Sequence, residues 1–245
     1  MNNKQLRKTV LILGANSDVA KACILQYVKR NFLVLAASRN TLELATFLKQ
    51  NNIDNSEVEI LYFDATAFET HQQFYQSLPQ KPNHVLYAAG YLKDNRKAME
   101  DWNASFQMMK VHYCGAVSML NIIATDTENQ GLERIIGLSS LSGVRGRKSN
   151  FIYGSTKAAF TQYLAGLRQL LNERNIVVNV VVAGYIRSKM TKGLELTESL
   201  MLEPEFIATA VVNANKNFIM VPGFKWKIIF FILRILPESL VAKLP

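Results

Sequence analysis

The chain has 245 residues, of which 49% are hydrophobic and 19% charged, and these proportions exclude a disordered or collagen-like protein. Its two cysteines cannot form a disulfide framework, and its three histidines have no ligand spacing, so no metal site is predicted. The net charge of +9 is spread out and forms no basic-aromatic motif, so we expect no nucleic-acid partner.

Short apolar runs rich in Val and Ile alternate with amphipathic stretches of helical length. Such runs are typical of strands that are buried on both faces. The predicted strands are Thr9–Leu13, Phe32–Ala37, Val58–Phe63, His84–Ala88, Arg134–Leu138, Val177–Val182 and Phe218–Val221. The predicted helices include Ala20–Arg30, Thr41–Asn51, Trp102–Thr125 and Tyr153–Glu173. This alternation predicts an α/β fold, a Rossmann-type doubly wound parallel sheet of about seven strands with helices on both faces.

The first apolar run follows basic residues in the manner of a signal peptide. Val10–Leu13 is too short for that role, however, and Gly14 interrupts it directly afterwards. We therefore interpret this run as the first strand and expect a cytoplasmic protein.

The turn after the first strand reads Gly14-Ala15-Asn16-Ser17-Asp18-Val19-Ala20. A glycine turn at this place lets backbone amides approach a pyrophosphate at a helix N-terminus. Gly14, Asn16, Ser17 and Asp18 are therefore candidate dinucleotide contacts. Only the first glycine of the usual pattern is kept, so an ordinary strand-to-helix turn is an equal alternative.

The second strand ends at Ser38-Arg39 and has no acidic residue nearby. NAD-dependent enzymes usually carry Asp or Glu here to hold the ribose hydroxyls. A hydroxyl and a guanidinium suit a 2′-phosphate instead. We therefore expect Ser38 and Arg39 to bind NADP(H), with a solvated loop arginine as the alternative.

The pattern with the clearest chemistry combines Ser140 with Tyr153 and Lys157. Tyr153 and Lys157 are four residues apart, so on a helix they share one face. A neighbouring ammonium lowers the pKa of a phenol, and a phenol tuned in this way gives a proton to a carbonyl oxygen. Ser140, at the end of the preceding strand, is expected to hold the same oxygen.

From about Lys8 to Val221 the chain resembles the classical short-chain dehydrogenase/reductase superfamily. The resemblance assigns the family's catalytic Ser, Tyr and Lys to Ser140, Tyr153 and Lys157. It implies further cofactor contacts at Asp64, Ala88, Ala89, Gly90, Gly184, Ile186 and Ser188. The GANSDVA turn and the apolar tail look like those of members related to decaprenylphosphoryl-2-keto-ribose reductase.

One departure from the family concerns its fourth catalytic residue, an Asn that holds a water in a proton relay. His112 occupies the corresponding position. A histidine donates, accepts and titrates near neutral pH, so His112 either keeps the relay or disables it. A helix-packing histidine is the third possibility.

These patterns predict an NADPH-dependent carbonyl reductase that acts on a small-molecule substrate, hydrophobic or lipid-linked. Lys189–Glu203 is expected to form a lid over the substrate, with Tyr91–Ala98 as the opposite wall. The alternative is a catalytically impaired NADP(H)-binding sensor or scaffold at a membrane. The long predicted helices are the surfaces through which this family pairs, so we expect a homodimer or tetramer.

Residues 1–223 are expected to form the NADP(H)-binding domain, and residues 224–245 a hydrophobic tail. The segment 224–236 contains the apolar run Ile228–Leu233, flanked by cations. Thirteen helical residues reach about 20 Å, short of the roughly 30 Å hydrocarbon slab, so they cannot span it. We expect this segment to contact either a membrane surface or a partner subunit, and the fold to survive its deletion.

Overall fold

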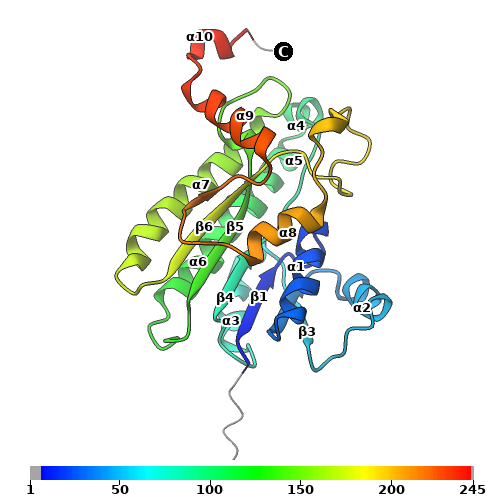
Figure 1. The fold of residues 1–245 in the computed structure, drawn as a ribbon, viewed down its shortest axis with the longest axis vertical. Helices are drawn as coiled ribbons and strands as arrows, with labels where there is room; N and C mark the ends of the chain where they lie inside the picture. Colours follow the sequence, from blue (N-terminus) through cyan, green and yellow to red (C-terminus); the bar gives the residue numbers. More distant parts are fainter. Residues whose placement is uncertain (1–6, 244–245) are drawn as a thin grey trace, which may run out of the picture.

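The computed structural model describes residues 7–243, which form one seven-stranded parallel sheet. The strands are β1 (Thr9–Leu13), β2 (Leu33–Ser38), β3 (Val58–Tyr62), β4 (His84–Tyr87), β5 (Arg134–Ser140), β6 (Val177–Ala183) and β7 (Ile219–Met220). Their order in the sheet is β3-β2-β1-β4-β5-β6-β7 (Figure 1). The seven predicted strands and the doubly wound fold are confirmed. The strand order reverses between β1 and β4, the place where such sheets bind ligands.

Helices cover both faces of the sheet (Figure 1). One face carries α1 (Asp18–Lys29), α2 (Thr41–Gln50) and α8 (Pro204–Val212). The other carries α3 (His71–Gln76), α6 (Gly115–Thr125), α7 (Phe151–Asn172) and α9 (Phe224–Ile235). Side chains of β1 alternate between the two cores, because Leu11 and Leu13 face one and Val10 and Ile12 the other.

The predicted helix Trp102–Thr125 is divided in the structure. It consists of α5 (Trp102–Met109), a π-helical turn (Lys110–Cys114) and α6. The short helix α4 (Asn95–Glu100) precedes it, and both α4 and α5 contact α7. The π turn contains His112, and turns of this kind occur frequently at functional sites.

The C-terminal segment packs on the sheet and contributes to its core. Trp226, at the start of α9, is only 4% exposed, and Leu233 is also buried. A Cβ atom at Gly184 would lie 2.1 Å from the Trp226 ring, so only glycine permits this approach. Deletion of residues 224–245 would uncover part of the core, so this packing argues against the expectation that the fold survives the deletion.

The chain continues from α9 into the short helix α10 (Glu238–Val241). Arg145 fixes this region, since its guanidinium donates to the carbonyl oxygens of Leu233 and Leu236 and pairs with Glu238. Between residues 7 and 243, no helix combines the length and the apolar character needed to cross a bilayer.

Candidate active site

A cavity of about 520 Å³ is lined by residues at the carboxyl ends of the strands. Every residue that was expected to bind the cofactor lines it, as do three of the four expected catalytic residues. These residues are Gly14, Asn16, Ser17, Asp18, Ser38, Arg39, Asp64, Ala88, Ala89, Gly90, Ser140, Tyr153, Lys157, Gly184, Ile186 and Ser188. His112 is the exception and lies behind the wall. Segments far apart in the sequence meet here because parallel strands end at one edge of the sheet.

The turn after β1 is shaped for close approach of another backbone. Gly14 has a φ of +88°, and a Cβ atom there would lie 2.4 Å from the Ala89 backbone nitrogen. The Asn16 amide donates to Ser38 Oγ at 2.8 Å and to the Asn40 carbonyl oxygen at 2.7 Å. Its own oxygen Oδ1 is buried and accepts no hydrogen bond from any described residue. A ligand with a donor group at this point, such as a dinucleotide, fits the turn.

The basic side chains around the end of β2 differ in whether they have partners. Lys21 and Lys189 both pair with Glu43, at 2.8 and 2.7 Å, and their hydrogen bonds lower the pKa of that carboxyl group. Arg39 is exposed and makes no ion pair within the described part of the chain. Its guanidinium is therefore available to a phosphate. The sequence did not indicate Glu43 or its contact with Lys189, which joins residues 146 positions apart.

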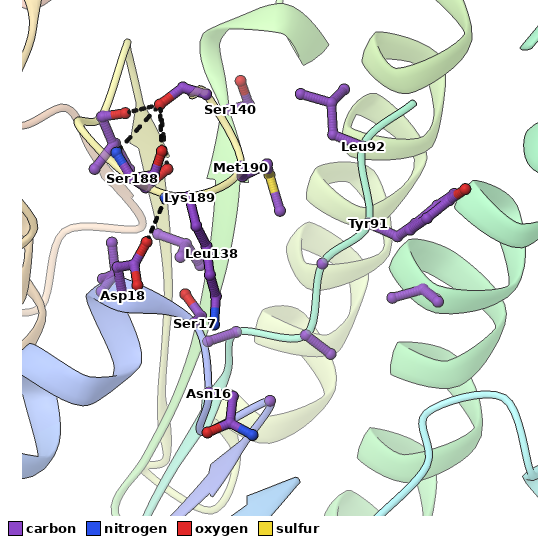
Figure 2. Close-up of a pocket in the computed structure, with 18 of the residues that line it drawn as sticks. Asn16, Ser17, Asp18, Tyr91, Leu92, Leu138, Ser140, Ser188, Lys189 and Met190 are labelled. Carbon is purple, nitrogen blue, oxygen red and sulfur yellow. Dashed lines mark hydrogen bonds between the residues drawn. The ribbon is translucent and has the colours of Figure 1, made fainter. Parts of the chain in front are cut away.

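Asp18 fixes the segment after β6 at the edge of the cavity. It is the first residue of α1, and its Oδ2 atom accepts a hydrogen bond from the Lys189 backbone nitrogen at 2.7 Å (Figure 2). The preceding residue, Ser17, occupies the N-cap position. The sequence suggested a cofactor contact for Asp18, and the structure adds this hydrogen bond to the first residue of the lid.

Ser140, Tyr153 and Lys157 approach the cavity from β5 and α7. Lys157 is 6% exposed, and its Nζ atom donates to the Leu138 carbonyl oxygen at 3.0 Å. The same Nζ atom lies 5.8 Å from the centroid of the Tyr153 ring. The neighbouring Ser139 directs its hydroxyl to α7 instead, where it bonds to Thr161 and to the Lys157 carbonyl oxygen. Both serines line the cavity, but the hydroxyl of Ser140 is the one that is not bonded to α7.

Burial determines the pKa values of this pair. It raises the pKa of Tyr153 to about 12, against a smaller lowering by the Ser140 hydroxyl. It lowers the pKa of Lys157 to about 7. In the free protein the net shift of the Tyr153 pKa is therefore upward and not downward, because desolvation disfavours the charged form of each group. The phenol holds its proton at neutral pH, as a proton donor must.

Both ring nitrogens of His112 are bonded within the protein. The Tyr91 backbone N–H donates to Nε2 at 3.0 Å, so the proton of the neutral ring sits on Nδ1. Nδ1 lies 2.7 Å from Thr156 Oγ1, whose own proton goes to the Tyr153 carbonyl oxygen. Burial, aided by the charge of Lys157, lowers the pKa of His112 well below its usual value. The ring has no nitrogen left for a relay water and does not titrate near neutral pH.

His112 instead lies against the expected proton donor, edge-on to the Tyr153 ring with centroids 5.2 Å apart. Replacement by Asn shortens the side chain and loses one of the two hydrogen bonds. Turnover should fall by no more than about tenfold, in line with about 1 kcal/mol for one neutral hydrogen bond. The pH profile should keep its shape, because Lys157 titrates there and His112 does not.

Steady-state rates of His112→Asn and wild type across a pH series measure this. An inflection near neutral pH that vanishes in the variant would restore the relay role. A large gain in activity would show that the natural histidine impairs catalysis.

The remaining wall of the cavity is mostly apolar and comes from two segments. Tyr91 and Leu92 follow β4, and Met190 follows β6 and faces them (Figure 2). The Met190 Cε atom would lie 3.1 Å from a Cβ at Gly90, so the segment expected as a lid crosses the cavity here. Leu194 completes this side.

Ion pairs hold the two ends of the lid together. Arg187 pairs with Glu198 at 2.7 Å and with Glu203 at 2.9 Å. These pairs join Arg187, which lies just before the lid, to two carboxylates within it.

Comparison with known proteins identifies relatives along most of the chain. The sequence model of the family described as short chain dehydrogenase matches residues 8–199. An uncharacterized oxidoreductase of Mycobacterium tuberculosis is 26% identical over 242 residues, which cover 96% of each protein. An uncharacterized oxidoreductase of Staphylococcus haemolyticus is 25% identical and covers 84% of this chain and 90% of its own.

Solved structures share the fold. A short chain dehydrogenase from Burkholderia cenocepacia, in complex with NADP, has a TM-score of 0.83 at 18% identity and covers 98% of each chain. Actinorhodin polyketide ketoreductase with NADPH has a TM-score of 0.74 at 16% identity and covers 84% of this chain and 89% of its own. These likenesses show a common arrangement of strands and helices.

Proposed function

The chain belongs to the short-chain dehydrogenase family, and on this basis we propose that it is an NADPH-dependent carbonyl reductase. The observation that carries the proposal is the meeting of Ser140, Tyr153 and Lys157 with the Gly14 turn and Arg39 around one cavity. The relatives named as oxidoreductases, and the structural neighbours with NADP or NADPH, support the same reaction class.

In this reaction Tyr153 gives its phenolic proton to the carbonyl oxygen of the substrate. The Ser140 hydroxyl donates a hydrogen bond to the same oxygen, where negative charge develops. Lys157 in its charged form stabilises the phenolate that remains. Its ammonium is lost as the pH rises through about 7, so this contribution is largest below neutral pH. Bound NADPH supplies the hydride that reaches the carbonyl carbon.

Arg39→Ala should weaken NADPH binding selectively. A charge-assisted hydrogen bond to the 2′-phosphate contributes about 1.5–3 kcal/mol, so affinity for NADPH should fall tenfold or more. NADH lacks this phosphate, and its affinity should change little. Titrations followed by nicotinamide fluorescence measure both, with Lys49→Ala as a control that removes an exposed cation from α2. Equal losses for the two cofactors would show that Arg39 does not bind the 2′-phosphate.

A second candidate is an NADP(H)-binding sensor or scaffold without turnover. It is favoured by His112, which replaces the family's relay residue with a ring that has no free nitrogen. The two candidates predict the same cofactor binding and differ in turnover. NADPH oxidation with a panel of ketones and a membrane lipid extract separates them.

The apolar wall formed by Tyr91, Leu92, Met190 and Leu194 supports a hydrophobic substrate, and a lipid-linked carbonyl compound is one such class. Peripheral membrane contact through residues 224–236 would bring a substrate of this kind to the protein. We also expect a homodimer or tetramer, supported by the exposed, stacked rings of Trp102 and Phe106 on α5. Sedimentation equilibrium measures this state, and monomer alone would remove the expectation.

A further inference from the structure

Helix α9 is apolar on two opposite faces, and among residues 7–243 only one of these faces packs on the rest of the protein. The inner face packs on the core through Trp226, Ile229, Phe230 and Leu233. The outer face is solvent-exposed and consists of Phe224, Ile228, Phe231, Ile232 and Ile235, whose exposed fractions run from 45% to 77%. A single exposed apolar side chain is ordinary, but a contiguous stripe marks an interaction surface.

The cations of α9 border this outer face. At 100° per residue, the five outer side chains span about 100° of the helix circumference. Lys225 lies along one edge of the stripe, and Lys227 and Arg234 lie along the other. The helix has no acidic residue, and within the described chain none of these three cations forms an ion pair.

We propose that the outer face of α9 docks on the surface of an anionic lipid bilayer. The apolar stripe would enter the boundary between headgroups and acyl chains, and the flanking cations would lie at the phosphates. A second copy of this chain fits the outer face of α9 less well than a bilayer does. A twofold contact through the same stripe would set the cations of the two copies against one another without acidic partners.

The docking helix is attached directly to the lid. Lys225 Nζ donates to the Ser199 carbonyl oxygen at 3.0 Å, and Trp226 Nε1 donates to the Leu200 carbonyl oxygen at 2.8 Å. Both acceptors belong to the 3₁₀ turn Glu198–Leu200 within the lid. Figure 1 shows α9 at the same end of the molecule as this segment. A bilayer on the outer face would therefore contact the helix that holds the lid, and this rests on the proposed function and extends it to substrates held in membranes.

Co-sedimentation with lipid vesicles tests whether the outer face of α9 binds a bilayer. Wild type should bind vesicles of phosphatidylcholine mixed with phosphatidylglycerol at low salt, bind less as salt rises, and bind weakly to phosphatidylcholine alone. The double variant Phe231→Ser/Ile235→Ser should lose at least tenfold in affinity. Lys227→Gln/Arg234→Gln should lose roughly thirtyfold, about fivefold for each cation.

A matched control removes two equally exposed apolar side chains elsewhere. Leu42→Ser/Tyr62→Ser, at 77% and 66% exposure on α2 and β3, should bind as wild type does. Thermal melts confirm that each variant is folded. Absence of wild-type binding to the anionic vesicles, or equal loss in the control, would overturn the proposal.

Sedimentation equilibrium in the absence of lipid tests whether a second copy of this chain binds the outer face of α9. A shift from dimer to monomer caused by Phe231→Ser/Ile235→Ser would overturn the proposal of a bilayer and show that the outer face binds a second copy. An unchanged mass with lost vesicle binding supports the bilayer. Vesicle binding needs no turnover, so its failure would leave the reductase proposal standing.

Discussion

Replacing Tyr153 with Phe should lower ketone reduction by on the order of 10²–10⁴-fold, because the variant loses its general acid. The phenyl ring keeps the volume and the edge-on contact with His112. The hydroxyl is the group removed, and in the free protein it carries its proton, since burial raises the pKa of Tyr153 to about 12. Steady-state rates of wild type and variant with one ketone measure the effect.

Two controls separate loss of chemistry from loss of structure. NADPH affinity of Tyr153→Phe should stay close to that of wild type, because the change removes one oxygen from the cavity wall. Tyr163→Phe removes a hydroxyl from the same helix, where it bonds to Asn121 and not to the cavity, and should leave the rate unchanged. Activity of Tyr153→Phe within a few-fold of wild type would refute its role as the acid.

Replacing Trp226 with Ala should lower the free energy of unfolding by about 3–5 kcal/mol, the usual range for a buried aromatic residue. The indole ring fills the space above Gly184, packs edge-on against Tyr185 and is 4% exposed. Its Nε1 atom also holds the lid at Leu200. Urea titration of the variant beside wild type measures the loss.

Phe231→Ala is the matched control on the same helix. Phe231 is 62% exposed, so its truncation should change the free energy of unfolding by no more than about 0.5 kcal/mol. Equal stability of Trp226→Ala and wild type would show that α9 does not belong to the core. The expected contrast between the two variants is also what permits the outer face to be altered without unfolding the chain.

The strands and most of the cavity could be predicted because both depend on local sequence signals. A strand buried on two faces appears as a short apolar run, and the site lies where such runs end. The residues after β1 and β2 could therefore be placed from Gly14 and Arg39, whereas Gly184 after β6 was placed by the resemblance to the family.

The remaining features depend on contacts that have no local signal. The Asp18 bond to Lys189 joins positions 171 residues apart, and the Trp226 approach to Gly184 joins different layers. The two apolar faces of α9 look alike in the sequence, and only packing distinguishes the buried one. The pKa direction of Tyr153 depends on how much water the fold removes, which residue spacing does not give.

The reduction itself is tested most directly by transfer of deuterium to a ketone from NADPH that carries deuterium at both positions of the nicotinamide C4. The reductase account predicts one deuterium on the carbinol carbon of the product for each NADPH consumed, and a loss of that transfer in Tyr153→Phe. NADPH that binds tightly, yet passes no deuterium to any ketone of the panel or of a membrane lipid extract, would contradict the account and favour the sensor.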